Sequence, residues 1–156
     1  MGRLKEGSAA QRTIETLGLA DAVEFVSGVS DERIVELYNE SACAVVPSLY
    51  EGFSLPAIEA MSATCPLVCT TGGAIPEVSG ADGETCYAVA PGDAEALAAG
   101  IRRALLDPDA AARIGRAGRE RVIHRWSWRR TAERTVEHYR ALLAETAAGS
   151  QELNPC

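Results

Sequence analysis

The order of hydrophobic and polar residues changes between two repeat patterns along the chain, which predicts strands alternating with helices. Short apolar runs predict buried strands, and stretches with apolar residues three or four positions apart predict amphipathic helices. The expected strands are 23–27, 42–46, 67–70 and 86–89. The expected helices are 8–18, 30–40, 55–63, 75–79, 93–106, 109–125 and 127–147. This alternation predicts an α/β fold with a doubly wound, parallel sheet.

The segment 47–59 is the most informative part of the chain, because it joins an expected strand to a well-marked helix start. Gly52 provides a residue suited to a tight turn, Ser54 is a good N-cap, and Pro56 fits the first helical turn. A helix that starts in this way offers free backbone N–H groups and the positive end of its dipole to a phosphate. The pattern therefore indicates a phosphate site in the loop before the helix.

Two carboxylates lie on either side of this helix start. Glu51 precedes the helix, and Glu59 lies about one turn inside it, roughly 7 Å further along the axis. A diphosphate at the helix start would then have a hydroxyl-rich group near each carboxylate, as in a nucleotide-sugar. An ordinary strand–helix joint, with acidic residues that only complement the helix dipole, is the alternative that the pattern leaves open.

Residues 51–59, Glu-Gly-Phe-Ser-Leu-Pro-Ala-Ile-Glu, resemble the E-x7-E motif of retaining glycosyltransferases with the GT-B fold, the family 4 type (glycosyl transferase group 1). Further segments on both sides of the motif resemble segments of the family and follow one another in the same order along the chain. These segments are 25–38, 63–78, 89–93 and 126–128. In that family, two Rossmann-like domains face each other across a cleft, and the C-terminal domain binds the sugar donor. The resemblance covers about residues 15 to 145 and implies that this chain is such a donor-binding domain.

The resemblance also implies a role for each motif residue. Glu51 would act in catalysis and bind sugar hydroxyls, and Glu59 would bind the ribose. The backbone of the helix start would bind the phosphates, and the Val29–Ser30 loop would bind the base. The donor would be a uridine or guanosine diphosphate sugar, with no metal and no further cofactor. The donor-binding residues implied are Val29, Ser30, Glu51, Gly52, Phe53, Ser54, Leu55 and Glu59.

Parts of the family pattern are missing from this sequence. The acceptor domain and the first strand and helix of the donor domain have no counterpart, and the family places an arginine and a lysine there against the diphosphate. Segment 1–7 resembles that basic segment only superficially, and we interpret Gly2-Arg3 as a later glycine turn. We therefore expect a truncated donor domain over 1–148, a disordered tail over 149–156, and no sugar transfer by this chain alone. A stand-alone nucleotide-binding or interaction module without catalysis is the alternative.

Charge and composition restrict the partners. A net charge of −7 argues against nucleic-acid binding. Eleven of the fifteen basic residues are arginines between Arg102 and Arg140, which leaves open a surface for an anionic partner, such as a membrane-borne acceptor, or a solvated helix face. Five cysteines without a C-x-x-C spacing and two histidines provide no metal-ligand set. The expected location is the cytoplasm, or the inner face of the membrane if the acceptor is a lipid.

The last expected helix carries an apolar stripe that needs a partner. In the family, the final helix packs on the acceptor domain. Here the apolar residues recur three or four positions apart over most of the stripe, which comprises Trp126, Trp128, Ala132, Val136, Tyr139 and Leu143. Because exposed apolar stripes recruit partners, we expect this chain to form a homodimer.

Overall fold

The computed structural model describes the backbone of residues 6–152 and the side chains of residues 6–146. The chain divides into two compact units, residues 1–37 and 38–156. The first unit contains α1 (Ala9–Thr16), a short 3₁₀ helix η1 (Ala20–Ala22) and most of α2 (Asp31–Glu40). None of the described residues of this unit is buried. The Gly2-Arg3 turn lies outside the described residues.

The strand expected over 23–27 is wrong. This segment has no strand structure, and the side chains of Val23 and Phe25 are 38% and 46% exposed. A β-strand exists only when a neighbouring strand pairs with its N–H and C=O groups, and no described residue pairs with this segment. Apolar alternation in a sequence marks a strand-like face, but it does not show whether a neighbouring strand is present.

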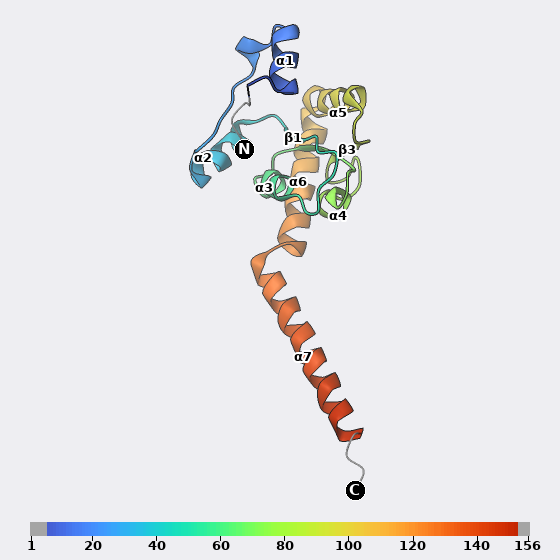
Figure 1. Ribbon diagram of the computed structural model, residues 1–156. Helices are drawn as coiled ribbons and strands as arrows, with labels where there is room; N and C mark the ends of the chain where they lie inside the picture. The colour runs from blue at the N-terminus through green and yellow to red at the C-terminus, as the bar shows by residue number, and fades with distance from the viewer. Residues whose placement is uncertain (1–5, 153–156) are drawn as a thin grey trace. The chain divides into compact units, whose positions relative to one another are not determined.

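The second unit is built on a parallel sheet of three strands in the order β1-β2-β3 (Figure 1). The strands are β1 (Ala44–Val46), β2 (Leu67–Thr70) and β3 (Tyr87–Val89). Val46 pairs with Cys69, and Cys69 in turn pairs with Ala88. The pairing is parallel throughout, as the alternation of strands and helices predicted.

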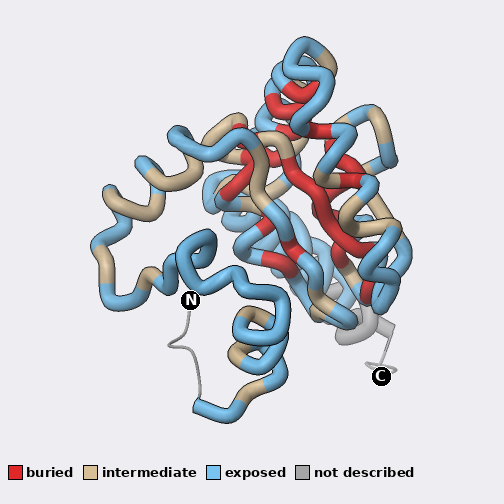
Figure 2. Tube along the Cα trace, turned by 90° about the horizontal axis from the view of Figure 1, so that it is seen from above, coloured by how far each residue is buried: buried red, intermediate tan, exposed pale blue. Residues whose placement is uncertain are grey.

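Helices cover both faces of the sheet and enclose the buried residues (Figure 2). Leu67 and Cys69 of β2 face one core, while Val68 between them faces the other. The first core is shared mainly with α3 and α4, and the second with α5 and α6. The doubly wound arrangement is therefore confirmed. The helices of this unit, after the end of α2, are α3 (Leu55–Ser62), α4 (Ile75–Ser79), α5 (Ala94–Leu106), α6 (Pro108–Arg125) and α7 (Trp128–Glu152).

The C-terminal part differs from the sequence expectation in two ways. Helix α7 continues to Glu152, so residues 149–152 are helical, and residues 153–156 lie outside the described part. Trp126 does not belong to the α7 stripe, because it is the C-cap of α6 and packs against the core. The described side chains of α7 are all exposed. Among the described helices, none is long and apolar enough to cross a membrane.

Candidate functional site

The loops that leave β1 and β2 are held against each other at the carboxyl ends of the strands. Thr70, the last residue of β2, donates its hydroxyl to the backbone oxygen of Ser48. Glu51 and Gly73 form an isolated parallel β-bridge, and the N–H of Ala74 donates to the oxygen of Glu51 at 2.8 Å. In doubly wound sheets, ligands bind at this end of the strands. The structure thus places the segment 47–59 where a ligand site is expected.

Two glycines make this close packing possible. A Cβ atom on Gly72 would lie 2.3 Å from the backbone oxygen of Leu49, and one on Gly73 would lie 2.3 Å from that of Glu51. Gly73 also has a φ of +66°, in the left-handed region that favours glycine. Gly52, the glycine expected to provide the tight turn, has no positive φ and no atom within 4 Å of a Cβ position. The positions that require glycine are therefore in the loop after β2, at Gly72 and Gly73.

The carboxylate of Glu51 is oriented by a neighbour in its own loop. Ser48 donates its hydroxyl to a carboxylate oxygen of Glu51, and both groups are partly buried. The backbone of Glu51 is fixed on its other side by the bridge to Gly73. The side chain therefore has a defined position at the edge of the loop, where one carboxylate oxygen is held by the protein and the other can accept hydrogen bonds from a hydroxyl group.

The start of α3 has free hydrogen-bond donors. Within the described residues, nothing accepts a hydrogen bond from the backbone N–H of Phe53, Ser54 or Leu55. Ser54 occupies the N-cap position as expected, but the expected hydrogen bond from its side chain to the helix is not made. Its hydroxyl is fully buried and has no partner in the described part of the chain. Buried polar groups normally have partners, so this helix start is suited to binding an anion.

An aromatic pair lies beside the helix start. The rings of Phe53 and Trp126 meet edge to face, with their centroids 5.2 Å apart. The indole N–H of Trp126 is buried and has no partner among the described residues. The sequence pattern placed Trp126 in the stripe on the last helix, because a tryptophan at a helix boundary fits either helix by spacing alone. The structure places it in support of the site loop.

Glu59 is exposed and is held by a residue that the sequence analysis did not assign. The hydroxyl of Tyr38 lies 3.3 Å from a carboxylate oxygen of Glu59 and 3.5 Å from the backbone oxygen of Pro56. Burial of the Tyr38 ring, together with the negative charge of Glu59, raises the pKa of Tyr38 to about 12. Tyr38 thus positions Glu59 one turn inside α3. Sequence spacing gave no signal for this contact, since the two residues come from different helices.

Val29 and Ser30 belong to the first unit. There, Ser30 caps α2 by accepting a hydrogen bond from the N–H of Arg33 at 3.4 Å, at the start of the helix expected over 30–40. A hydrogen bond from the same serine lowers the pKa of Glu32. The proposed contact of Val29 and Ser30 with a nucleotide base stays a prediction. Among the described residues, no group of His, Cys, Asp or Glu side chains could hold a metal ion.

We expect Tyr38→Phe to remove a pH dependence of stability at alkaline pH. Since the folded pKa of about 12 is above the ordinary tyrosine pKa of 10.0, the folded state retains a proton that the unfolded state loses. The resulting stabilisation is complete below pH 10 and is lost as the pH rises through 12, and it amounts to about 1 kcal/mol after allowance for solvent screening. Urea unfolding at several alkaline pH values measures this loss. Equal losses in both proteins would contradict the assignment.

The family model described as "Glycosyl transferases group 1" matches residues 1–121. The chain belongs to this family. It is 41% identical over 146 residues to the MMP alpha-(1->4)-mannosyltransferase of Mycolicibacterium hassiacum. The matched region covers 94% of this chain and 36% of that protein. It is 38% identical over 120 residues to the glycogen synthase of Mycobacterium tuberculosis, over 77% of this chain and 29% of that protein.

A solved structure supports the same assignment. The sucrose-phosphate synthase of Thermosynechococcus elongatus superimposes with a TM-score of 0.80 at 36% identity, over 87% of this chain and 34% of that one. The chain thus spans about a third of the length of the relatives that it matches. These similarities confirm that this group 1 glycosyltransferase chain has the fold of the Rossmann-like, C-terminal half of a GT-B protein.

Proposed function

We propose that the chain is the donor-binding portion of a retaining glycosyltransferase, which transfers a sugar from a nucleoside diphosphate sugar to an acceptor. The observation that carries this proposal is the start of α3, where free backbone N–H groups and the unpartnered Ser54 hydroxyl lie between two carboxylates, Glu51 and Glu59. Membership of the glycosyl transferases group 1 family supports it. Two relatives are named for sugar transfer or sugar-polymer synthesis, as a mannosyltransferase and a glycogen synthase.

Each part of this site would have a separate task. The backbone N–H groups of Phe53, Ser54 and Leu55 would bind the diphosphate, and Glu59 would accept hydrogen bonds from the ribose hydroxyls. Glu51, oriented by Ser48, would bind hydroxyls of the transferred sugar and lie near the reacting centre. When the bond between sugar and diphosphate breaks, negative charge accumulates on the departing diphosphate. Fixed N–H donors at a helix start stabilise this charge without having to reorganise.

Glu59→Gln is expected to weaken the binding of a uridine or guanosine diphosphate sugar by about tenfold, because a charged acceptor for the ribose is replaced by a neutral one. Calorimetric titration of the purified chain with both donors measures this change. Glu145→Gln, an equal charge change on the exposed surface of α7, is the matched control and should bind as the parent does.

The outcomes of this titration separate the alternatives. An unchanged dissociation constant in Glu59→Gln would contradict the role of Glu59. A parent chain that binds neither donor at millimolar concentration would contradict the proposed function as a whole. Binding of a donor by the parent chain, weakened only in Glu59→Gln, would support both.

A further inference from the structure

A hollow lies away from the candidate functional site, between the last turns of α5 and the first turns of α6. It has a volume of about 580 Å³, and its lining includes Tyr87, Arg102, Arg103, Leu106, Arg113 and Ile114. Tyr87 is the first residue of β3, so the hollow lies near the amino ends of the strands. The candidate functional site lies at the carboxyl ends. The two sites therefore use opposite ends of the sheet.

Tyr87 provides an unsatisfied polar group in this hollow. The residue is 3% exposed, and its hydroxyl is buried without a hydrogen-bond partner in the part of the chain that the structure describes. The guanidinium of Arg103 lies over its ring, 5.0 Å from the centroid. A buried hydroxyl without a partner is rare in a folded protein, because it has lost its hydrogen bonds to water. A ligand with a hydrogen-bond acceptor would satisfy it.

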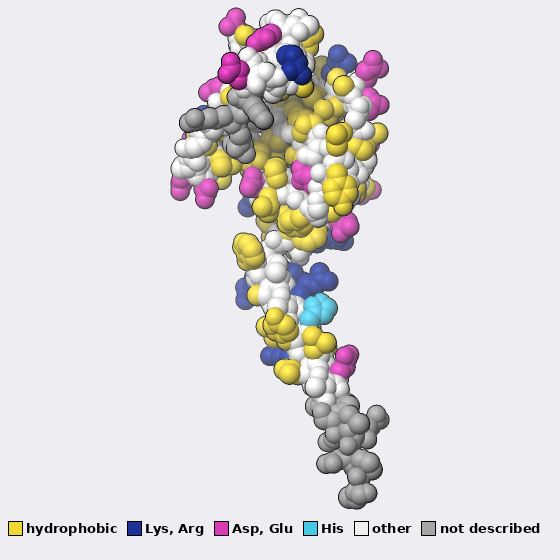
Figure 3. Space-filling model, viewed as in Figure 1, with side chains coloured by type: hydrophobic (Ala, Val, Ile, Leu, Met, Phe, Trp, Pro, Cys, Tyr) yellow, Lys and Arg dark blue, Asp and Glu magenta, His cyan; other side chains and the backbone are white. Residues whose placement is uncertain are grey.

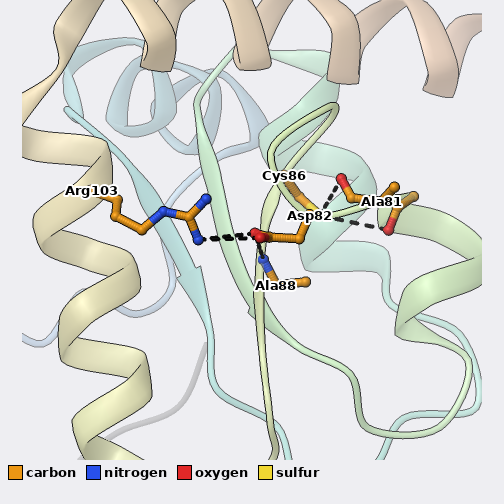
Figure 4. Close-up of polar contacts among 6 residues, drawn as sticks. Ala81, Asp82, Cys86, Ala88 and Arg103 are labelled. Carbon is orange, nitrogen blue, oxygen red and sulfur yellow. Dashed lines mark hydrogen bonds and ion pairs between the residues drawn. The ribbon is translucent and has the colours of Figure 1, made fainter.

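The charged residues around the hollow are mostly positive. Arg103 forms an ion pair with Asp82 at 3.2 Å, and the N–H of Ala88 donates to the same carboxylate at 2.9 Å (Figure 4). These contacts fix Arg103 against the wall. Arg102 and Arg113 form no ion pair with any described residue.

The remaining wall of the hollow is partly acidic and partly apolar. Asp107 is the one acidic side chain of the lining, and it accepts a hydrogen bond from the N–H of Ala110 at 2.9 Å as the N-cap of α6. Apolar wall is provided by Leu106, Ile114 and Ala99. The hollow therefore combines two unpaired guanidinium groups, a free phenol donor and an apolar surface.

We propose that this hollow binds a small phosphate monoester. Arg102 and Arg113 would bind the phosphoryl oxygens, the Tyr87 hydroxyl would donate to one of them, and the apolar wall would contact the organic part. Guanidinium groups match the geometry of a phosphate, whereas the start of α6 is already capped by the carboxylate of Asp107 and adds no free donor. The site is independent of the donor site. It also gives part of the arginine-rich segment 102–140 a ligand, where the sequence left open a solvated surface or an anionic partner.

The test is calorimetric titration of the full chain with glycerol phosphate and with inorganic phosphate. The double variant Arg102→Gln/Arg113→Gln should bind at least about tenfold more weakly, and Tyr87→Phe, which keeps the ring, about threefold more weakly. The matched control Arg134→Gln/Arg140→Gln removes two exposed arginines from α7 and should bind as the parent does. Circular dichroism of each variant shows whether the fold is kept.

The source of the phosphate is tested with vesicles. Co-sedimentation with phosphatidic acid vesicles, whose headgroup is a phosphate monoester, absent with phosphatidylcholine vesicles and lost in the arginine double variant, would assign the phosphoryl group to a lipid headgroup. Binding of glycerol phosphate in solution with no vesicle binding would assign it to a soluble ester. Failure of the parent chain to bind any of these probes would overturn the proposal. Equal binding by the parent and a folded arginine double variant would overturn it too, because the anion would then lie elsewhere.

Discussion

Replacement of Gly73 by alanine should lower the free energy of unfolding by about 4 kcal/mol and should displace Glu51. The added Cβ would lie 2.3 Å from the backbone oxygen of Glu51 and 3.0 Å from its nitrogen. Backbone atoms cannot yield as a flexible side chain can, so the loop 49–51 has to move or the bridge has to break. Both responses remove the geometry that holds Glu51 at the carboxyl ends of the strands, and we expect donor binding to be lost with it.

A glycine with the same backbone requirement but with open space provides the control. Gly92 has a φ of +79°, and its nearest atom to a Cβ position is a methyl carbon of Leu49 at 3.8 Å. Gly92→Ala therefore carries the strain of the left-handed backbone, about 1–2 kcal/mol, without the clash. Urea unfolding followed by tryptophan fluorescence measures both variants. If Gly73→Ala and Gly92→Ala lowered the free energy of unfolding equally, the close approach of the two loops would make no contribution to stability.

Local signals predicted the second unit well. The bounds of β2 and α4 agree with the sequence expectation, and α3, α5 and α6 differ by one residue at an end. Asp93 caps α5 by accepting a hydrogen bond from the N–H of Ala96 at 2.8 Å. Apolar runs, prolines in first turns and capping residues act within a few residues of where they stand. Their structural effect can therefore be predicted from the sequence around them.

Features that depend on a distant part of the chain were not predicted. The segment 23–27 has a strand-like pattern, yet pairing requires a neighbouring strand, which the pattern does not contain. Ser54 lies at the helix start as expected, but whether its hydroxyl caps the helix or stays free depends on how deeply the loop is buried. Tyr38 is 21 positions from Glu59, and only the fold of the second unit brings the two side chains together.

In the candidate site, too, the features that local sequence determines were predicted, and those that depend on distant residues were not. The sequence motif identified Glu51 and Glu59, because their spacing around a helix start can be recognised in the chain itself. The groups that hold them were not identified. Ser48 could be found only from its hydrogen bond to Glu51, and Gly73 only from the close approach of two loops. The hollow beside Tyr87 also required the fold, since its arginines come from two helices and its hydroxyl from a strand.

The purified chain should form a dimer at tens of micromolar protein, and Trp128→Arg should convert it to a monomer. Hydrophobic side chains follow α7, with basic residues between them (Figure 3). Trp128, Tyr139 and Leu143 are 89%, 64% and 71% exposed, and Val136 between them is 44% exposed. Their spacing places them along one side of the helix, and a second copy of the same helix offers a matching surface about a two-fold axis.

Light scattering measures the mass of the parent chain and of each variant. Val35→Arg is the matched control, because Val35 is a 51% exposed apolar residue on a helix of the first unit, and its replacement adds the same charge outside α7. If the stripe is the contact, Val35→Arg stays dimeric while Trp128→Arg does not. Replacing one large apolar side chain of such a contact by a charged one costs several kcal/mol, since the charge would have to be buried without a partner. A parent chain that is monomeric at this concentration would exclude α7 as a self-association surface, and its exposed residues would then have no partner in a second copy of this chain.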